Sequence, residues 1–296
     1  MKNKKTKDLA IFALFVFPAV AFVLFATDIP FVMNLYYSVF NWNGIGKNME
    51  FVGLANYVKI FTADPLFWKG VRFTLKFAVF YVVIVNIVSL TVAIVMAREN
   101  KVNSLGRAFY YIPYIISLTA ISLIWKFILG PGFEALYSVT GWEFFNWSWL
   151  GTPKLAFYVV VVMAVWQNLG FYMVNYIAGI IAVPGELLEA ARIDGCGEIR
   201  SLFAITLPLM KSAICTVATM NLNFVWGELM WAQISTLLTD KGLPLTVGLL
   251  NFKGQISTNW PQLCAAIIIV IAPLYLLFLF TQKYFIAGLT AGGVKG

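Results

Sequence analysis

Charged residues are scarce in this 296-residue chain: they make up 11% of it, whereas hydrophobic residues make up 61%. Soluble domains carry about 25% charged residues. The chain also has no histidine, which excludes imidazole metal sites and Ser-His catalysis. Its three cysteines, Cys196, Cys215 and Cys264, have no CxxC spacing and predict no disulfide framework. We therefore expect an integral membrane protein and not a soluble enzyme.

Several chemical signatures are missing as well. The sequence contains no GxxxxGK[ST] phosphate loop, no GxGxxG after a strand and no HExxH. Within its apolar segments the only ionisable candidates are Lys126 and Glu228, whereas ion-driven carriers usually bury several such groups. We therefore predict a chain that is not an enzyme, binds no cofactor or metal itself, and takes its energy from another subunit. A polytopic membrane enzyme is the less favoured alternative, because clustered carboxylates are lacking.

Six segments are apolar over the roughly 20 residues that a membrane-spanning helix needs. They lie near residues 9–27, 77–97, 108–129, 155–182, 212–238 and 261–282. Glu228 interrupts the fifth, but residues 229–238 continue its apolar pattern. The pattern predicts an all-α polytopic membrane protein with a six-span domain over residues 9–282.

Basic residues gather at the start of the chain, where four of the first seven residues are lysines. Segments rich in Lys and Arg stay on the cytoplasmic side of a membrane. Residues 1–8 are therefore predicted to be cytoplasmic, and six spans return the tail, residues 283–296, to the same side. The expected location is the cytoplasmic membrane.

Residues 183–211, between the fourth and fifth predicted spans, have the pattern of two short helices around a turn. Pro184 suits the start of the first helix, and Gly195 suits the left-handed residue that ends many helices. A second helix is predicted from about Glu198 to just before Pro208. Periodicity alone leaves open whether this amphipathic pair docks on a partner, lies on the membrane or packs on its own bundle.

The spacing within this loop resembles the EAA loop of permease subunits of binding-protein-dependent ABC importers. Glu189-Ala190-Ala191 is followed after three residues by Gly195, and after nine more by Ile205-Thr206-Leu207-Pro208. The string Glu-Ala-Ala-Arg-Ile-Asp-Gly resembles the carbohydrate-uptake branch, of the maltose and glycerol-phosphate type. The resemblance implies a type I ABC importer permease architecture with a cytoplasmic coupling loop that docks on the ATPase subunit. The residues implied in that docking are Glu189, Ala190, Ala191, Asp194, Gly195, Ile205, Leu207 and Pro208.

The resemblance also implies a function: inward translocation of a sugar or oligosaccharide by alternating access. The implied partners are a sister permease in a heterodimer, two subunits that bind ATP and Mg, and an extracytoplasmic solute-binding protein; no nucleic acid is implied. Residues 37–44 and 51–57 resemble one sister permease of the maltose type, and residues 243–249 and 284–296 resemble the other, which leaves open which half of the pair this chain fills. An importer permease for an amino acid, phosphate or a polyamine is the alternative.

Two stripes of polar and aromatic residues are candidates for the sugar pathway, because sugars bind to aromatic faces and to amide or carboxylate groups. At about 100° per residue each set lies on one face of its span. The stripes are Asn168, Tyr172 and Asn175 in the fourth span, and Asn221, Phe224, Glu228 and Trp231 in the fifth. The alternative is that these side chains form the interhelical hydrogen bonds of an ordinary bundle.

Overall fold

The computed structural model describes residues 2–44, 46, 48–227 and 259–293. The chain divides into two compact units. The first comprises residues 1–67 and 249–272, and the second comprises residues 68–248 and 273–296.

Five helices in the described part of the chain are long and apolar enough to cross a membrane. They are Ile11–Tyr37, Phe67–Met96, Leu118–Thr140, Pro153–Ile181 and Trp260–Gln282. The helices Glu198–Leu209 and Lys211–Gly227 meet at 71° and supply a sixth span if they are counted as one. The helical, polytopic fold class predicted from the sequence is thereby confirmed.

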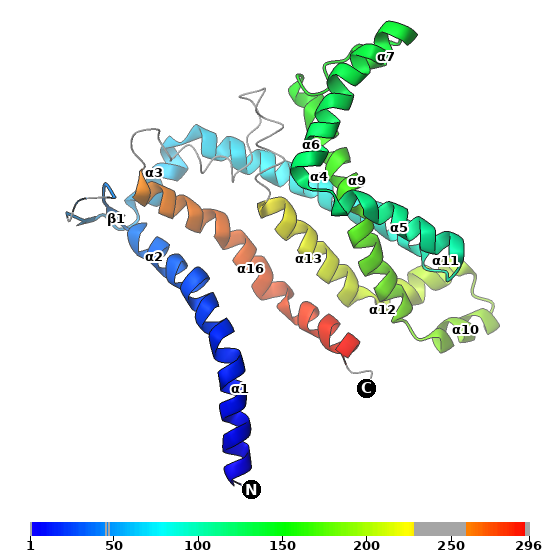
Figure 1. The fold of residues 1–296 in the computed structure, drawn as a ribbon, viewed down its shortest axis with the longest axis horizontal. Helices are drawn as coiled ribbons and strands as arrows, with labels where there is room; N and C mark the ends of the chain where they lie inside the picture. The colour runs from blue at the N-terminus through cyan, green and yellow to red at the C-terminus, as the bar shows by residue number, and fades with distance from the viewer. Residues whose placement is uncertain (1, 45, 47, 228–258, 294–296) are drawn as a thin grey trace. The chain divides into compact units, whose positions relative to one another are not determined.

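The first unit begins with one continuous helical stretch (Figure 1). α1 (Lys2–Val23) passes through the π-helical turn η1 (Leu24–Asp28) into α2 (Ile29–Tyr37). Pro30 is the second residue of α2, so its missing N–H falls in the first turn of that helix, where it is tolerated. The first span therefore extends beyond its predicted end at residue 27.

A small folded corner follows α2. Strands β1 (Phe40–Asn41) and β2 (Glu50–Phe51) pair antiparallel, with Phe40 opposite Phe51. Asn56 of α3 (Ala55–Ala63) donates hydrogen bonds of 2.9 Å from Nδ2 to the carbonyl oxygens of Ser38 and Phe40. Residues 37–44 and 51–57, which resemble one sister permease of the maltose type in sequence, thus form one hydrogen-bonded unit.

The second unit is built around α4 (Pro65–Met96), α9 (Pro153–Ile181) and α13 (Lys211–Gly227). Their buried faces form one apolar core. Tyr81 and Val85 of α4, Met173 and Tyr176 of α9 and Val217 of α13 are almost completely enclosed in it.

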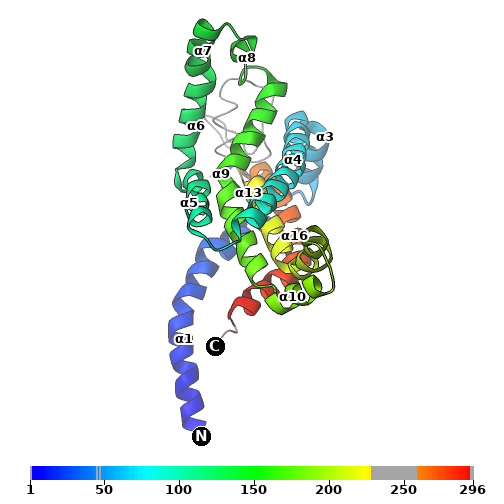
Figure 2. The ribbon, with the colours of Figure 1, turned by 90° about the vertical axis from the view of Figure 1, so that its right-hand side faces the viewer.

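α5 (Lys101–Ile115) lies along α9 (Figure 2). The two backbones lie very close together at Gly170. A Cβ at that position would stand 2.2 Å from the carbonyl oxygen of Tyr110 and 2.7 Å from Cα of Tyr111. Only a residue without a Cβ lets α5 lie so close to α9.

The third predicted span, residues 108–129, is wrong in its bounds. The helix breaks after α5, and the span candidate runs through α6 (Leu118–Phe127), the π-helical turn η2 (Ile128–Gly132) and α7 (Phe133–Thr140). Ile116 is extended, and the Ser117 hydroxyl accepts a hydrogen bond of 3.3 Å from the Ala120 amide, which caps a new helix. A hydropathy average does not detect this cap, because one serine barely changes an apolar window.

Candidate functional site

The loop between α9 and α13 begins with α10 (Gly185–Ile193), whose N-terminal flanking residue is Pro184. The Gly195 amide donates to the Arg192 carbonyl at 3.0 Å, and the Cys196 amide donates to the Ala191 carbonyl at 2.8 Å. This pair of bonds is a Schellman motif, which needs a left-handed residue after the helix. Gly195 supplies it with φ +76°. The sequence prediction of a left-handed helix end at Gly195 is confirmed.

The second half of the loop is longer than predicted. α11 (Glu198–Ser201), the π-helical turn η3 (Leu202–Thr206) and α12 (Leu207–Leu209) follow one another without a break. The prediction that the helix stops before Pro208 is therefore wrong. The wide π-helical turn directly before Leu207 and Pro208 accommodates a residue that has no N–H to donate.

Most of the predicted docking residues are accessible. Glu189, Ala190, Asp194, Gly195 and Pro208 are exposed, Ile205 and Leu207 are half-buried, and Ala191 is buried. Large apolar side chains are exposed beside them, namely Leu187, Ile193, Ile199 and Phe203. Such an exposed apolar patch is typical of a protein contact surface.

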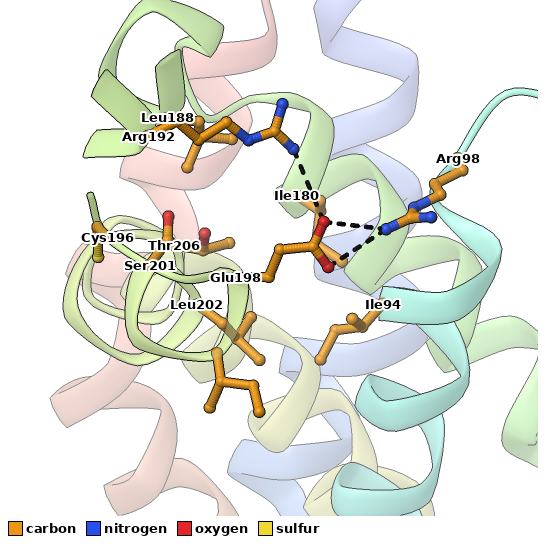
Figure 3. A pocket seen from close by; sticks show the side chains of 11 residues that line it. Ile94, Arg98, Ile180, Leu188, Arg192, Cys196, Glu198, Ser201, Leu202 and Thr206 are labelled. Carbon is orange, nitrogen blue, oxygen red and sulfur yellow. Dashed lines mark hydrogen bonds and ion pairs between the residues drawn. The ribbon is translucent and has the colours of Figure 1, made fainter. Parts of the chain in front are cut away.

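A pocket of about 290 Å³ lies at the base of this loop, lined by side chains that include Ile94, Ile180, Leu188 and Leu202. The carboxylate of Glu198 lies at its rim between two guanidinium groups (Figure 3). Arg98 Nη2 donates to both Glu198 oxygens at 3.3 Å, and Arg192 Nη2 stands 3.9 Å from Oε1. Glu198 thus ties the loop to Arg98, which lies two residues past the end of α4.

The span-four stripe lies in the core of the second unit. Asn168 and Tyr172 are buried, and Asn175 is half-buried. Asn168 Nδ2 donates to the Ala164 carbonyl at 2.9 Å, and Asn175 Nδ2 donates to the Phe171 carbonyl at 2.8 Å. Both amides therefore satisfy part of their hydrogen-bonding capacity on their own helix.

Asn221 of the span-five stripe lies in a polar cluster that joins three helices. Its Nδ2 donates to Asn86 Oδ1 of α4 at 3.3 Å, and the Tyr176 hydroxyl of α9 donates to the same oxygen. Asn221 is fully buried, and its Oδ1 has no hydrogen-bond partner among the described residues. Sequence reasoning missed Asn86 and Tyr176, although one asparagine within a charge-free span was a usable signal.

Phe224 is the other described member of the span-five stripe. Phe224 packs against Tyr81 of α4, with ring centroids 5.9 Å apart. Glu228 and Trp231 lie outside the described residues. The pathway role of the whole set stays a prediction.

Comparisons with known proteins agree with this architecture. The family described as binding-protein-dependent transport system inner membrane component matches residues 86–290. The probable starch degradation products transport system permease protein AmyD of Thermoanaerobacterium thermosulfurigenes is 33% identical over 79% of this chain and 76% of its own length. The diacetylchitobiose uptake system permease protein NgcF of Streptomyces coelicolor is 34% identical over 67% of this chain and 60% of its own length.

The fold also has a match among solved structures. A chain of a bacterial ABC transporter involved in the import of the acidic polysaccharide alginate superposes with a TM-score of 0.77. The match covers 99% of both chains at 15% sequence identity. The two chains share the ABC importer permease fold.

Proposed function

Because this chain belongs to the family of binding-protein-dependent transport system inner membrane components, we propose that it is the permease subunit of an ATP-driven sugar importer. It is a multi-pass membrane protein, and its activity is transport. The cargo is a sugar or oligosaccharide, carried inward by alternating access.

The proposal of a saccharide cargo rests on the similarity to AmyD and NgcF, because both are named for saccharide transport. The residues of this chain are compatible with a neutral polyol. Asn168, Tyr172, Asn175 and Asn221 offer amides and a ring, which suit hydroxyl groups and the CH faces of a sugar. In this proposal the pathway opens between α9 and α13 when the core of the second unit rearranges.

Energy reaches the chain through the loop of residues 183–211. The exposed apolar side chains around Glu189 and Gly195 dock on an ATPase subunit, and two such subunits hold the ATP and Mg. A sister permease completes the pathway, and an extracytoplasmic binding protein delivers the sugar. Residues 1–8 and 283–296 are cytoplasmic in this arrangement.

Transport assays in proteoliposomes test the proposal. The chain is reconstituted with its sister permease, ATPase subunits and binding protein, and uptake is measured for labelled maltooligosaccharides, chitooligosaccharides, an amino acid, inorganic phosphate and a polyamine. We expect ATP-dependent uptake of a saccharide alone. Uptake of phosphate, an amino acid or a polyamine without any saccharide would contradict the sugar assignment, and uptake without ATP would contradict the importer class.

A further inference from the structure

Three cations lie on one face at the start of α4. They are Lys69, Arg72 and Lys76, and all three are exposed. At about 100° per residue their positions fall within roughly 60° of one another around the helix. Both ion pairs in the described part of the chain involve Glu198, so none of the three has a carboxylate partner there.

The same face becomes apolar one turn further along. Val79, Val83 and Ile87 are 61%, 52% and 61% exposed. Around the helix axis, each of them lies within about 60° of the mean direction of the three cations. Tyr81, Val85 and Ser89, by contrast, are fully buried and lie on the opposite side of α4. The cationic and apolar residues therefore form one continuous outward face, with positive charge at one end and aliphatic side chains along the rest.

The position of the charge along the helix matches the layers of a bilayer. Residues 77–97 carry no charge, and at 1.5 Å per residue this run is about 30 Å long, the thickness of the hydrocarbon core. Lys76 is the first residue beyond it, and Arg72 and Lys69 follow over about 10 Å. The headgroup layer is roughly 5–8 Å thick, so Lys76 and Arg72 lie within it.

Packing holds one of these cations in place. Nζ of Lys76 lies 4.2 Å from the ring centroid of Phe157 on α9 and 5.9 Å from that of Tyr158. A cation over an aromatic face loses part of its side-chain freedom. The ammonium group is thus kept at the junction of α4 and α9, where the apolar face begins.

From this arrangement we propose that the Lys69–Arg72–Lys76 face binds an anionic phospholipid. Its phosphate contacts the cations and its acyl chains lie along Val79, Val83 and Ile87. A lipid is the one occupant whose own layout, with an anionic head followed by an apolar tail, repeats the order of the residues on α4. Arg98, just past the other end of α4, contacts the coupling loop, so the lipid belongs to the leaflet opposite that loop.

Site-specific crosslinking to lipid tests the inference. A photoactivatable phenylalanine analogue replaces Val79 in the full-length chain, which is reconstituted in vesicles of equal phosphatidylglycerol and phosphatidylcholine. Mass spectrometry then gives the ratio of the two lipid adducts. We expect phosphatidylglycerol to exceed phosphatidylcholine about fivefold or more, since one cation near the surface contributes about that factor.

Matched variants separate charge from folding. Lys69→Gln/Arg72→Gln/Lys76→Gln should bring the adduct ratio close to one, whereas Lys69→Arg/Arg72→Lys/Lys76→Arg should keep it high. If the triple glutamine variant fails to insert, Lys76→Gln alone should lower the ratio by a smaller factor. An adduct ratio that is the same in the glutamine variants as in the parent chain would overturn the proposal. So would loss of the phosphatidylglycerol excess when glycerol phosphate is added, or adducts to protein in place of lipid.

Discussion

Gly195 is the one residue with a positive φ in the loop of residues 183–211. Its φ of +76° closes the Schellman motif after α10, and a Cβ built there has no neighbour within 4 Å. The cost of a side chain is therefore conformational and not steric, about 1–2 kcal/mol for an ordinary L-residue. The direction of the chain from α10 into α11 depends on this turn.

Substitution of Gly195 should consequently uncouple transport without preventing membrane insertion. We expect Gly195→Val to weaken binding of the ATPase subunits and to abolish sugar uptake, measured by co-purification and by uptake in vesicles. Gly195→Asn is the matched control, because asparagine tolerates the left-handed region better than other residues with a Cβ. Equal uptake by the valine and asparagine variants would show that the turn is not required.

Asn86 and Asn221 should differ in their contribution to stability. Asn86 Oδ1 accepts from two helices, whereas Asn221 makes one 3.3 Å bond and leaves its own Oδ1 unpaired within the described residues. Asn86→Leu should destabilise the chain by about 1–2 kcal/mol, the upper range for polar contacts between membrane helices, and Asn221→Leu by less. Thermal unfolding in detergent, followed by tryptophan fluorescence, measures both.

The uptake assay adds a second result for the same pair. If Asn221 lines the pathway, Asn221→Leu should change saccharide affinity while the melting temperature stays near that of the parent chain. An Asn221→Leu variant that is less stable than Asn86→Leu would mean that the polar cluster is held together differently from the hydrogen bonds described.

At the scale of elements, the contact of α5 with α9 depends on Gly170. A Cβ there would collide with backbone atoms of Tyr110 and Tyr111, which cannot move as a side chain can. We expect Gly170→Ala to cost about 1–3 kcal/mol, as overpacking does, and to lower the melting temperature. Gly130→Ala is the control, because a Cβ there has no neighbour within 4 Å. Equal melting temperatures for the two variants would contradict the close approach.

The Arg98–Glu198 pair links α4 to the coupling loop across exposed surface. Exposed ion pairs contribute about 0–1 kcal/mol, so Glu198→Gln should scarcely change the melting temperature. We expect it instead to lower the amount of sugar transported per ATP hydrolysed, because the loop is then tied less firmly to α4. The exchange Arg98→Glu/Glu198→Arg should restore part of that ratio. An unchanged ratio in Glu198→Gln would make the pair a surface contact without a role in coupling.

For the whole molecule, the absence of a phosphate-binding loop from the sequence leads to one further prediction. The purified chain, free of other subunits, should neither bind nor hydrolyse ATP. Phosphate release and binding of a fluorescent ATP analogue measure this, and addition of the ATPase subunits should produce hydrolysis. ATP hydrolysis by the isolated chain that persists after further purification would contradict the proposal that only the ATPase subunits hydrolyse ATP.

Much of this protein follows from its sequence. Low charge and long apolar runs require a membrane-spanning helical protein, because unpaired backbone groups cannot be left in lipid. Local chemistry placed the turn at Gly195, since a glycine after an amphipathic helix is the residue that adopts positive φ without strain. Spacing within residues 183–211 identified the family through a single loop.

Tertiary structure decided which residues meet. The break at Ser117 and the passage of the loop helix through Pro208 depend on one cap and one π-helical turn, which contribute almost nothing to an average hydropathy.

The meeting of Asn86, Tyr176 and Asn221, and of Arg98 with Glu198, joins residues about 90 or more positions apart in the chain. Periodicity assigns each of these residues to a face of its own helix, but only the packing of α4, α9 and α13 sets which faces touch, because contact depends on side-chain fit across helices.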